Sequence, residues 1–309
     1  MKERGGAFFL SILHIMIDKK CALIIILSSL ALASFLFGEV QFRPDSEESL
    51  RLRLYGGLST LQPGDLNRGL AGWLDLWNYA AELNGLPPGA GFYGARWGIE
   101  AGADLLIPLG PWLSLGLGAG SISASAGSQS HFPSNDVVPS SHEIKVRTWA
   151  VPLRAGLHCL FPLTDRLDIR LQAGAAYYLA RAEAEYTRDW NGYWEKDRYK
   201  LKSAGLGYQG GIGFELRLNR WAAVFLEGQA RLARISNFSG SLERTSSEGG
   251  SILQEGTLYL IDYKLAEGAV FSVVDVLDEQ PSGPAFLKVG KAVVDFSGFA
   301  LNMGLTLRF

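Results

Sequence analysis

Hydrophobic and polar residues alternate one by one in eight stretches of this chain, and the C-terminal stretch shows the pattern most clearly. Its apolar positions share one parity and are Phe299, Leu301, Met303, Leu305, Leu307 and Phe309. The positions between them are small or polar and run from Gly298 to Arg308. Since successive side chains of a β-strand point to opposite faces, each stretch predicts a strand with one apolar and one polar face.

The other seven stretches are joined by connections of alternating length. They cover residues 50–59, 97–105, 113–120, 149–161, 167–179, 206–218 and 224–232. Tight turns are expected at 108–111, 162–166 and 219–220, and long polar connections at 60–93, 123–143, 188–200 and 236–290. This alternation predicts antiparallel strands in up-and-down order, with all short turns at one end.

The apolar faces have a length suited to a membrane. From Leu167 to Tyr177, from Tyr208 to Leu218 and from Phe299 to Phe309 there are ten positions each, and a tilted spanning strand needs about 9–11 residues. Aromatic residues at both interfaces are typical of such strands. The predicted aromatic girdle consists of Trp97, Trp149, Phe161, Tyr177, Tyr208, Phe299 and Phe309. Trp112 and Trp221 are left out because they are out of phase with the apolar face.

Residues 49–309 resemble the small eight-stranded bacterial outer-membrane β-barrels of the OmpA, OmpX and OmpW type. The resemblance rests on the strand pattern and on the ending Leu305-Thr306-Leu307-Arg308-Phe309. It implies a closed antiparallel up-and-down transmembrane β-barrel, porin-like in architecture, with short periplasmic turns and long extracellular loops in the Gram-negative outer membrane. Leu305, Leu307 and Phe309 resemble the signal that is read by the barrel-assembly machinery. The implied partners are that machinery, outer-membrane lipids and lipopolysaccharide.

Two features leave the strand count open between eight and ten. Residues 257–264 and 269–276 are further β-like runs within the last long connection. They fit either an external hairpin or two additional spanning strands, and an even number of strands results in both cases. The second run is short for a span, so we predict eight strands.

The N-terminal region has the layout of a secretory signal peptide. Lys19 and Lys20 precede an apolar run from Cys21 to Gly38, and Ala31-Leu32-Ala33 supplies a small-x-small cleavage site. We expect a signal peptide over 1–33, with Met16 as an alternative start, and a short periplasmic segment over 34–48. Cys159 is then the one remaining cysteine, which excludes an internal disulfide.

The polar faces carry charges of both signs, which we assign to the barrel lumen. An eight-stranded barrel is just wide enough for side chains to fill, so we expect a plug of ion pairs instead of a selective pore. The predicted network is Arg51, Arg53, Glu100, Asp104, Arg154, Asp168, Arg170, Glu215, Arg217, Glu227 and Arg231. Because Glu100, Arg154 and Glu227 lie six or seven residues from their periplasmic turns, we expect these three to pair across the lumen.

A helix is expected in the first long connection. Leu66, Leu70, Trp73, Leu74, Trp77 and Ala81 recur at helical spacing. Asp65 is placed to cap the start, and Asn84-Gly85 followed by Pro87-Pro88 ends it. The helix is expected to pack on the barrel rim; the alternatives are a ligand or partner surface, or a position on the lipopolysaccharide interface.

Composition adds little chemistry. The formal net charge of -2 over 309 residues gives no basic field for nucleic acid, and no motif or cluster indicates a metal or cofactor. We expect a monomer. His131 and His142 lie among serines, but no nucleophile-elbow motif is present. The expected function is non-enzymatic: a structural, adhesive or ligand-binding role through the external loops. The alternatives are a narrow channel for small or apolar solutes and an outer-leaflet lipid-modifying enzyme.

Overall fold

A computed structural model describes residues 49–89, 91–131, 138–190, 192–265 and 268–309. The predicted signal peptide and the 34–48 segment lie outside these residues. Among the described residues, no helix combines the length and the apolar character needed to cross a membrane.

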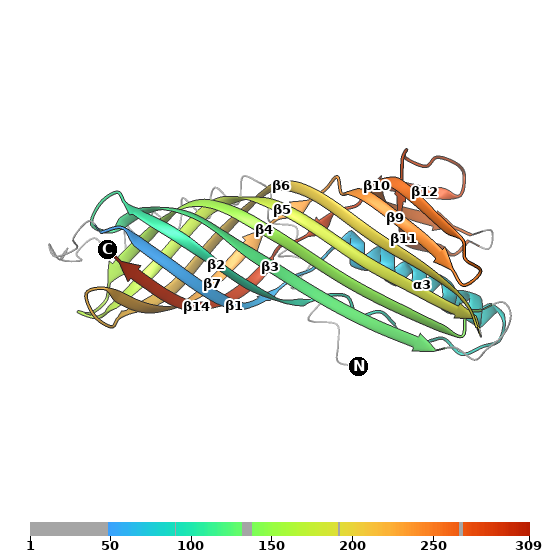
Figure 1. Ribbon diagram of the computed structural model, residues 1–309, viewed down its shortest axis with the longest axis horizontal. Helices are drawn as coiled ribbons and strands as arrows, with labels where there is room; N and C mark the ends of the chain where they lie inside the picture. The colour runs from blue at the N-terminus through green and yellow to red at the C-terminus, as the bar shows by residue number, and fades with distance from the viewer. Residues whose placement is uncertain (1–48, 90, 132–137, 191, 266–267) are drawn as a thin grey trace. The chain divides into compact units, whose positions relative to one another are not determined.

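Eight antiparallel strands form a ring, as the alternating stretches predicted (Figure 1). Each pairs with the next in sequence, and the last lies between the first and the seventh. The ring strands are β1 (Arg51–Thr60), β2 (Trp97–Pro108), β3 (Leu113–His131), β4 (Ser141–Pro162), β5 (Leu167–Trp190), β6 (Tyr193–Arg217), β7 (Ala222–Leu232) and β14 (Gly298–Arg308).

The strands are strongly staggered around the ring. One row of paired residues starts at Ala150 on β4, passes through Glu100 on β2 and Glu227 on β7, and returns to β4 at Leu160, ten residues away (160 − 150). A ten-residue offset at ~3.3 Å per residue, around eight strands ~4.8 Å apart, corresponds to a strand tilt of ~40°. The tilt lies in the range of membrane barrels.

Four ring strands are much longer than the sequence predicted. β3, β4, β5 and β6 have 19, 22, 24 and 25 residues. Most of the expected loops 123–143 and 188–200 are therefore strand. Their outward positions are polar, which resembles a loop in sequence, but alternate residues such as Ile144, Val146 and Tyr199 are buried on the inner face.

Beyond the ring, the long strands continue into an outer sheet. β9 (Ser239–Ser246) pairs with the first part of β6, and β10 (Ser251–Lys264) joins β9 to β11 (Val270–Leu277) and to β12 (Phe286–Lys291). β8 (Arg234–Ile235) and β13 (Val294–Asp295) form a short separate pair. The runs 257–264 and 269–276 thus form an external hairpin, which confirms eight ring strands over ten.

The expected helix is present as α3 (Asp65–Leu83) and packs in the core of the outer half. Leu66, Leu70 and Leu74 are buried together with inner-face residues of the long strands. Gly69 and Gly72 allow a close approach to β11, because a Cβ atom on either would overlap that strand. Asp65 does not cap the helix, since its carboxylate accepts a hydrogen bond from the backbone of Val293 at 2.9 Å.

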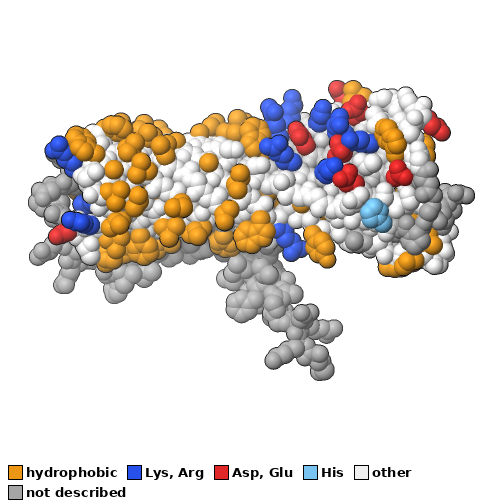
Figure 2. All heavy atoms as spheres, turned by 60° about the horizontal axis from the view of Figure 1, so that its bottom comes forward, with side chains coloured by type: hydrophobic (Ala, Val, Ile, Leu, Met, Phe, Trp, Pro, Cys, Tyr) orange, Lys and Arg blue, Asp and Glu red, His pale blue; other side chains and the backbone are white. Residues whose placement is uncertain are grey.

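Along the long strands, the apolar face changes from the outside of the barrel to the inside, and the charged face changes in the opposite direction. Near the short turns, the outer face of β5 is apolar up to Leu179 and its inner face carries Asp168 and Arg170. Farther out, the inner face is Ala- and Tyr-rich up to Tyr186, and the outer face carries Arg181 and Glu183. In Figure 2, orange side chains cover one section of the surface, and blue and red side chains gather beyond it.

Candidate functional site

The charged residues that the sequence assigned to the lumen lie on the inner, polar face of the ring strands. Arg217 keeps the most exposed side chain of the ion-paired members, at 29%, and most of the others are buried. Arg51 is buried, but its Nε and Nη1 atoms have no hydrogen-bond partner in the described part of the chain. The remaining ten residues all form ion pairs within 4.0 Å.

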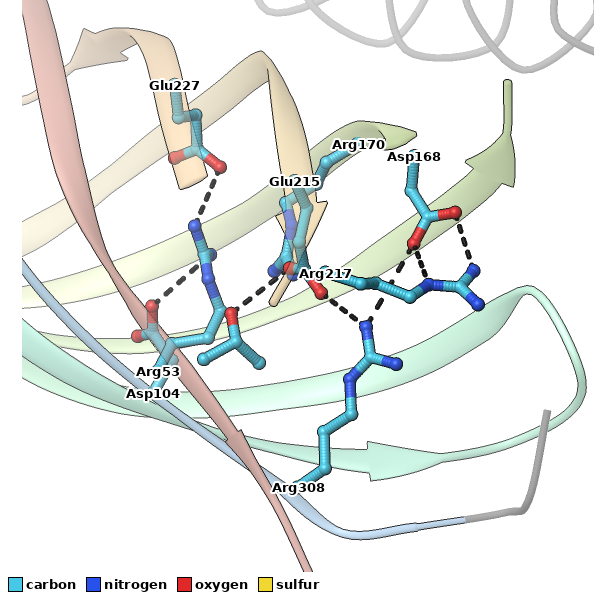
Figure 3. Close-up of polar contacts among 9 residues, drawn as sticks. Arg53, Asp104, Asp168, Arg170, Glu215, Arg217, Glu227 and Arg308 are labelled. Atoms are coloured by element: carbon cyan, nitrogen blue, oxygen red, sulfur yellow. Dashed lines mark hydrogen bonds and ion pairs between the residues drawn. The ribbon is translucent and has the colours of Figure 1, made fainter. Parts of the chain in front are cut away.

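The centre of the lumen is occupied by a chain of alternating charges (Figure 3). The Arg53 guanidinium lies 3.0 Å from Glu227 and 3.7 Å from Asp104. Arg154 reaches the other oxygen of Asp104 at 3.1 Å. Gln172 donates a hydrogen bond to Glu227 at 2.6 Å. Each carboxylate therefore has two partners, which offsets the cost of removing it from water.

Aromatic rings support both of these guanidinium groups. The Arg53 guanidinium lies over the Phe225 ring at 4.0 Å, and that of Arg154 lies over the Tyr55 ring at 4.9 Å. A cation above an aromatic face is stabilised by the ring quadrupole. Each of the two guanidinium groups is therefore held by an aromatic ring as well as by its carboxylate partners.

A second group of charges lies nearer the short turns (Figure 3). Glu215 forms an ion pair with Arg170 and a second one with Arg308 at 2.9 Å. Asp168 accepts two hydrogen bonds from Arg217, at 2.7 and 3.0 Å. Arg308 belongs to this network although the predicted set did not include it.

Glu100, Arg154 and Glu227 do not pair with one another, so the expected three-way contact is wrong. Glu100 pairs with Arg231 and accepts a hydrogen bond from Asn302 at 2.5 Å. Arg154 and Glu227 pair instead with the partners described above. The number of residues from the nearest turn predicted similar depths in the barrel, but it was not sufficient to predict which side chains form ion pairs.

Glycine residues help decide which side chains meet. Gly118 stands between Asp104 and Arg154 in one row of strand pairing. A Cβ atom there would overlap the Asp104 carboxylate, so only glycine leaves the space through which the two charges touch. Gly57 has the same relation to Asn302.

The lumen network encloses very little space. A cavity of about 10 Å³ is lined by residues including Asp104, Arg154, His158 and Gln172. This volume corresponds to about one water molecule. Side chains therefore fill the lumen at this level, which does not favour the narrow-channel alternative.

The predicted aromatic girdle divides into two groups. Five of its members are exposed on the outer face: Trp97, Tyr177, Tyr208, Phe299 and Phe309. Trp149 is half-buried and donates a hydrogen bond to Ser121 at 2.9 Å. Phe161 differs from the expectation because it is buried against the ring of Trp112, with centroids 6.3 Å apart. Trp112, left out of the prediction, is the more exposed of the two.

The C-terminal strand closes the ring. Leu305 and Leu307 pair with Leu54 and Leu52 of β1, and the backbone N–H of Phe309 donates to Leu50 at 2.9 Å. The same strand pairs with β7 on its other side. Recognition of this strand by the assembly machinery stays a prediction.

A different polar cluster lies at the outer end of the inner face, above the apolar core. Ser130 on β3 and His142 on β4 are directly opposite each other in the strand register, and both side chains are buried. Opposed residues of an antiparallel pair have Cβ atoms about 4.5–5.5 Å apart. The fold therefore brings a hydroxyl and an imidazole side by side.

His142 is held in place by aromatic side chains. Its Nδ1 atom lies 2.8 Å from the Tyr186 hydroxyl, and the two rings stack with centroids 5.7 Å apart. Trp77 of α3 contacts the imidazole at a centroid distance of 5.7 Å. Burial, together with the positive charge of Arg188, lowers the pKa of His142 to about 3. The imidazole is therefore neutral at physiological pH.

A network of ion pairs begins at Arg188, which is opposite His142 in the strand register. Arg188 lies 2.9 Å from Asp197 and 3.1 Å from Glu195, and Arg244 lies 3.1 Å from Asp275. Burial raises the pKa of both Asp197 and Asp275, and the neighbouring arginines oppose the shift. The charges hold β5, β6, β9 and β11 together around the outer end.

Sequence reasoning noted His142 among serines but did not place it opposite Ser130. It missed Arg188 and Asp197, because it assigned residues 188–200 to a loop, and it missed Tyr186, because it ended the fifth strand at residue 179. The alternation of Ile144 and Val146 with Glu143 and Lys145 was the available signal that the strands continue. The described residues bring no three potential metal-binding side chains together at one point.

A closed antiparallel ring with an apolar outer band and a charged, filled interior defines an outer-membrane type of β-barrel. No family model and no curated protein matches the chain. Among solved structures, it is similar to the outer membrane protease OmpT from Escherichia coli, at 10% sequence identity and a TM-score of 0.30. The similarity covers 87% of this chain and 98% of that one.

The expectation of a non-enzymatic protein finds no support in this comparison, because the similar structure is that of an enzyme. The sequence offered catalysis only as an alternative because no nucleophile-elbow motif is present, although catalytic residues are often brought together only by the fold. No residue role, substrate or reaction is carried over from that protease, because the similarity is confined to the general fold.

Proposed function

We propose that the chain is a hydrolase of ester or amide bonds, built on a small eight-stranded barrel of the outer membrane. The observation that carries the proposal is the opposition of Ser130 and His142 on the inner face, with His142 bound to Tyr186 through Nδ1. Nucleophilic acyl transfer requires a serine hydroxyl within hydrogen-bond reach of an oriented, neutral histidine. The Ser130 Oγ atom forms no hydrogen bond with any described residue, so the proposed reaction requires its hydroxyl to turn toward Nε2 of His142.

Each residue has a defined part in the reaction. The reaction uses the tautomer in which Nδ1 donates its proton to the Tyr186 oxygen, which leaves Nε2 of His142 as the basic nitrogen. The Ser130 hydroxyl gives its proton to Nε2 while its oxygen bonds to the substrate carbonyl carbon. His142 then passes the proton to the leaving group, and water hydrolyses the acyl-serine to regenerate the hydroxyl.

The height of the pair bears on the substrate. His142 lies seven residues beyond Trp149 along β4 (149 − 142), which is ~23 Å along the strand and ~18 Å along the axis at the ~40° tilt. Acyl esters of a lipid lie near the aromatic boundary, below this level. The position favours a substrate outside the bilayer, such as a peptide or a soluble ester, over the lipid substrate that the sequence suggested.

Both side chains are buried, so substrate binding must displace the side chains that cover them. Trp77 lies against His142, and the ring of Trp190 meets that of Trp77 at a centroid distance of 5.9 Å. Exchange of Trp77 for alanine is therefore expected to speed the reaction of Ser130 with a small reagent.

Labelling with a fluorophosphonate, which reacts with activated serines, tests the proposal. The folded full chain in detergent is expected to be labelled, and Ser130→Ala and His142→Gln are each expected to lose the label. Ser128→Ala is the matched control, because Ser128 lies two residues away on the same face and bonds to Gly91. Labelling that persists in Ser130→Ala, or that never exceeds the heat-unfolded control, would overturn the assignment.

A further inference from the structure

Four cations lie on the outer face of the barrel where the apolar band ends. Arg181 and Lys202 are neighbours in the register of β5 and β6, and the same row continues to Trp149 on β4. One row farther out, Arg147 and Lys200 stand on either side of Glu183. All four cations are exposed. Figure 2 shows blue side chains gathered next to the orange section.

These cations differ from the charges farther out on the same strands. Lys145 pairs with Glu143 at 2.8 Å, and Lys196 pairs with Glu185 at 2.7 Å. In contrast, none of Arg147, Arg181, Lys200 and Lys202 has a carboxylate within 4.0 Å among the residues that the structure describes. The Arg181 guanidinium lies over the ring of Trp149 at 5.3 Å. On β4, β5 and β6 the two boundary rows thus hold four positive charges against the negative charge of Glu183. The outer of these rows continues through Ser241 on β9 to Glu255 on β10.

The position of the unneutralised charges points to what neutralises them. The next two rows inward on these strands are apolar. They contain Leu179, which pairs with Ala204, and Leu206, which pairs with Tyr177, and both leucines are exposed on the outer face. Tryptophan beside the row is typical of the membrane interface. A cation one row beyond the hydrocarbon boundary meets the headgroups of the lipid leaflet and not its acyl chains.

We infer that Arg147, Arg181, Lys200 and Lys202 form a binding site for the phosphate groups of an anionic lipid headgroup in the outer leaflet. Two adjacent rows on three strands give a patch in which cross-strand neighbours are ~5 Å apart. Guanidinium groups bind phosphate oxygens in a bidentate way, and lysine adds point charges that follow the headgroup. This surface lies on the outside of the wall and is independent of Ser130 and His142.

Binding to vesicles tests the inference. The full chain, folded in phosphatidylcholine vesicles, is titrated with lipid A, a bisphosphorylated glycolipid, and binding is followed through Trp149 fluorescence and by co-flotation. Each basic residue near an anionic surface contributes about fivefold in affinity, so Arg181→Gln/Lys202→Gln is expected to bind about thirtyfold more weakly. The matched control, Lys145→Gln/Lys196→Gln, removes the same charge from paired positions and is expected to bind within about twofold of the unmodified chain.

The outcomes separate the sources of phosphate. Equal loss of binding in both double variants would indicate a general charge effect and overturn the site. Displacement of lipid A by inorganic phosphate at equal concentration would show a free-anion site and overturn the lipid assignment. Heat-modifiable migration of each variant on gels confirms that the barrel has folded, so a weak-binding variant is not an unfolded one.

Discussion

Arg53→Met is the substitution that probes the filled lumen most directly. Arg53 is 1% exposed and neutralises two carboxylates, Glu227 at 3.0 Å and Asp104 at 3.7 Å. Methionine has a similar length and is apolar, so the change removes the charge with little change in volume. The variant leaves Asp104 with Arg154 and Glu227 with Gln172.

The expected loss follows from these contacts. Breaking a buried ion pair by removing one partner costs about 3–5 kcal/mol, because the other charge stays buried. The surviving partners place the value near the lower limit, and loss of the contact between Arg53 and the Phe225 ring adds to it. We expect the free energy of unfolding to fall by about 3 kcal/mol.

Urea titration of the barrel in vesicles, followed by tryptophan fluorescence, measures this change. Arg217→Met is the control: its side chain is 29% exposed, and its partner Asp168 keeps Arg308 at 4.0 Å. Because the Arg217 side chain is partly in water and the buried Asp168 carboxylate keeps Arg308, we expect a smaller loss than for Arg53→Met, about 1 kcal/mol. Arg53→Met/Glu227→Leu removes the stranded charge and is expected to recover more than half of the loss. Equal effects of Arg53→Met and Arg217→Met, or no recovery in the double variant, would refute the reasoning.

Four further outcomes are expected. Gly118→Ala should lower the free energy of unfolding by about 1–3 kcal/mol through overpacking, whereas Gly127→Ala, which meets only Ile144 at 3.7 Å, should change it by less than about 1 kcal/mol; similar values for both would contradict the spacing role. Because the pKa of His142 is about 3 when folded and ~6.5 when unfolded, its contribution to stability is complete above pH ~6.5 and declines as the pH falls. Urea titrations at pH 6.5 and pH 5 should thus show that the free energy of unfolding falls in both proteins, and that the fall is about 2 kcal/mol smaller in His142→Gln than in the unmodified chain. Phe309→Asp should lower the assembled fraction on heat-modifiability gels, and Arg308→Gln should lower mainly the unfolding temperature through its pair with Glu215; equal assembled fractions would count against the role of Phe309. Cell fractionation should recover the protein with the outer membrane, and a soluble periplasmic pool would exclude that location.

The alternation of side chains was sufficient to predict the ring and its two faces. On β5, the apolar positions from Leu167 to Leu179 face outward and Asp168 and Arg170 face inward, as the period of two requires. The eight-strand count also followed, because the second β-like run at 269–276 is too short to span. These properties depend on local sequence alone.

Partner choice in the lumen could not be predicted in the same way. It depends on the ten-residue stagger of the ring and on open positions such as Gly118, which lets Arg154 reach Asp104. Neither is visible in a single stretch. Depth estimated from the nearest turn was therefore insufficient to find the partner of Arg154.

The polar cluster around Ser130 and His142 was not predicted, because charged residues on the outer face made the outer parts of the long strands resemble loops. Lys196, Arg198 and Lys200 make residues 188–200 look like a polar loop, although Asp197 and Tyr199 between them are buried. The inner residues gain their apolar partners from α3 and β11, which are distant in sequence. Only the packed outer half shows that Tyr186 lies against His142.

The exchange of character between the two faces of the wall fixes how deep the barrel is immersed. A shift of the strands toward the periplasm would carry Arg181 and Lys202 into hydrocarbon, at a cost of ~0–1 kcal/mol for each near the interface that rises to ~2–4 kcal/mol at the bilayer midplane. The opposite shift would expose first Leu179 and then Leu206, one row farther inward, to water. The change from apolar to charged residues on the outer face of the long strands thus sets how far their outer ends extend beyond the lipid.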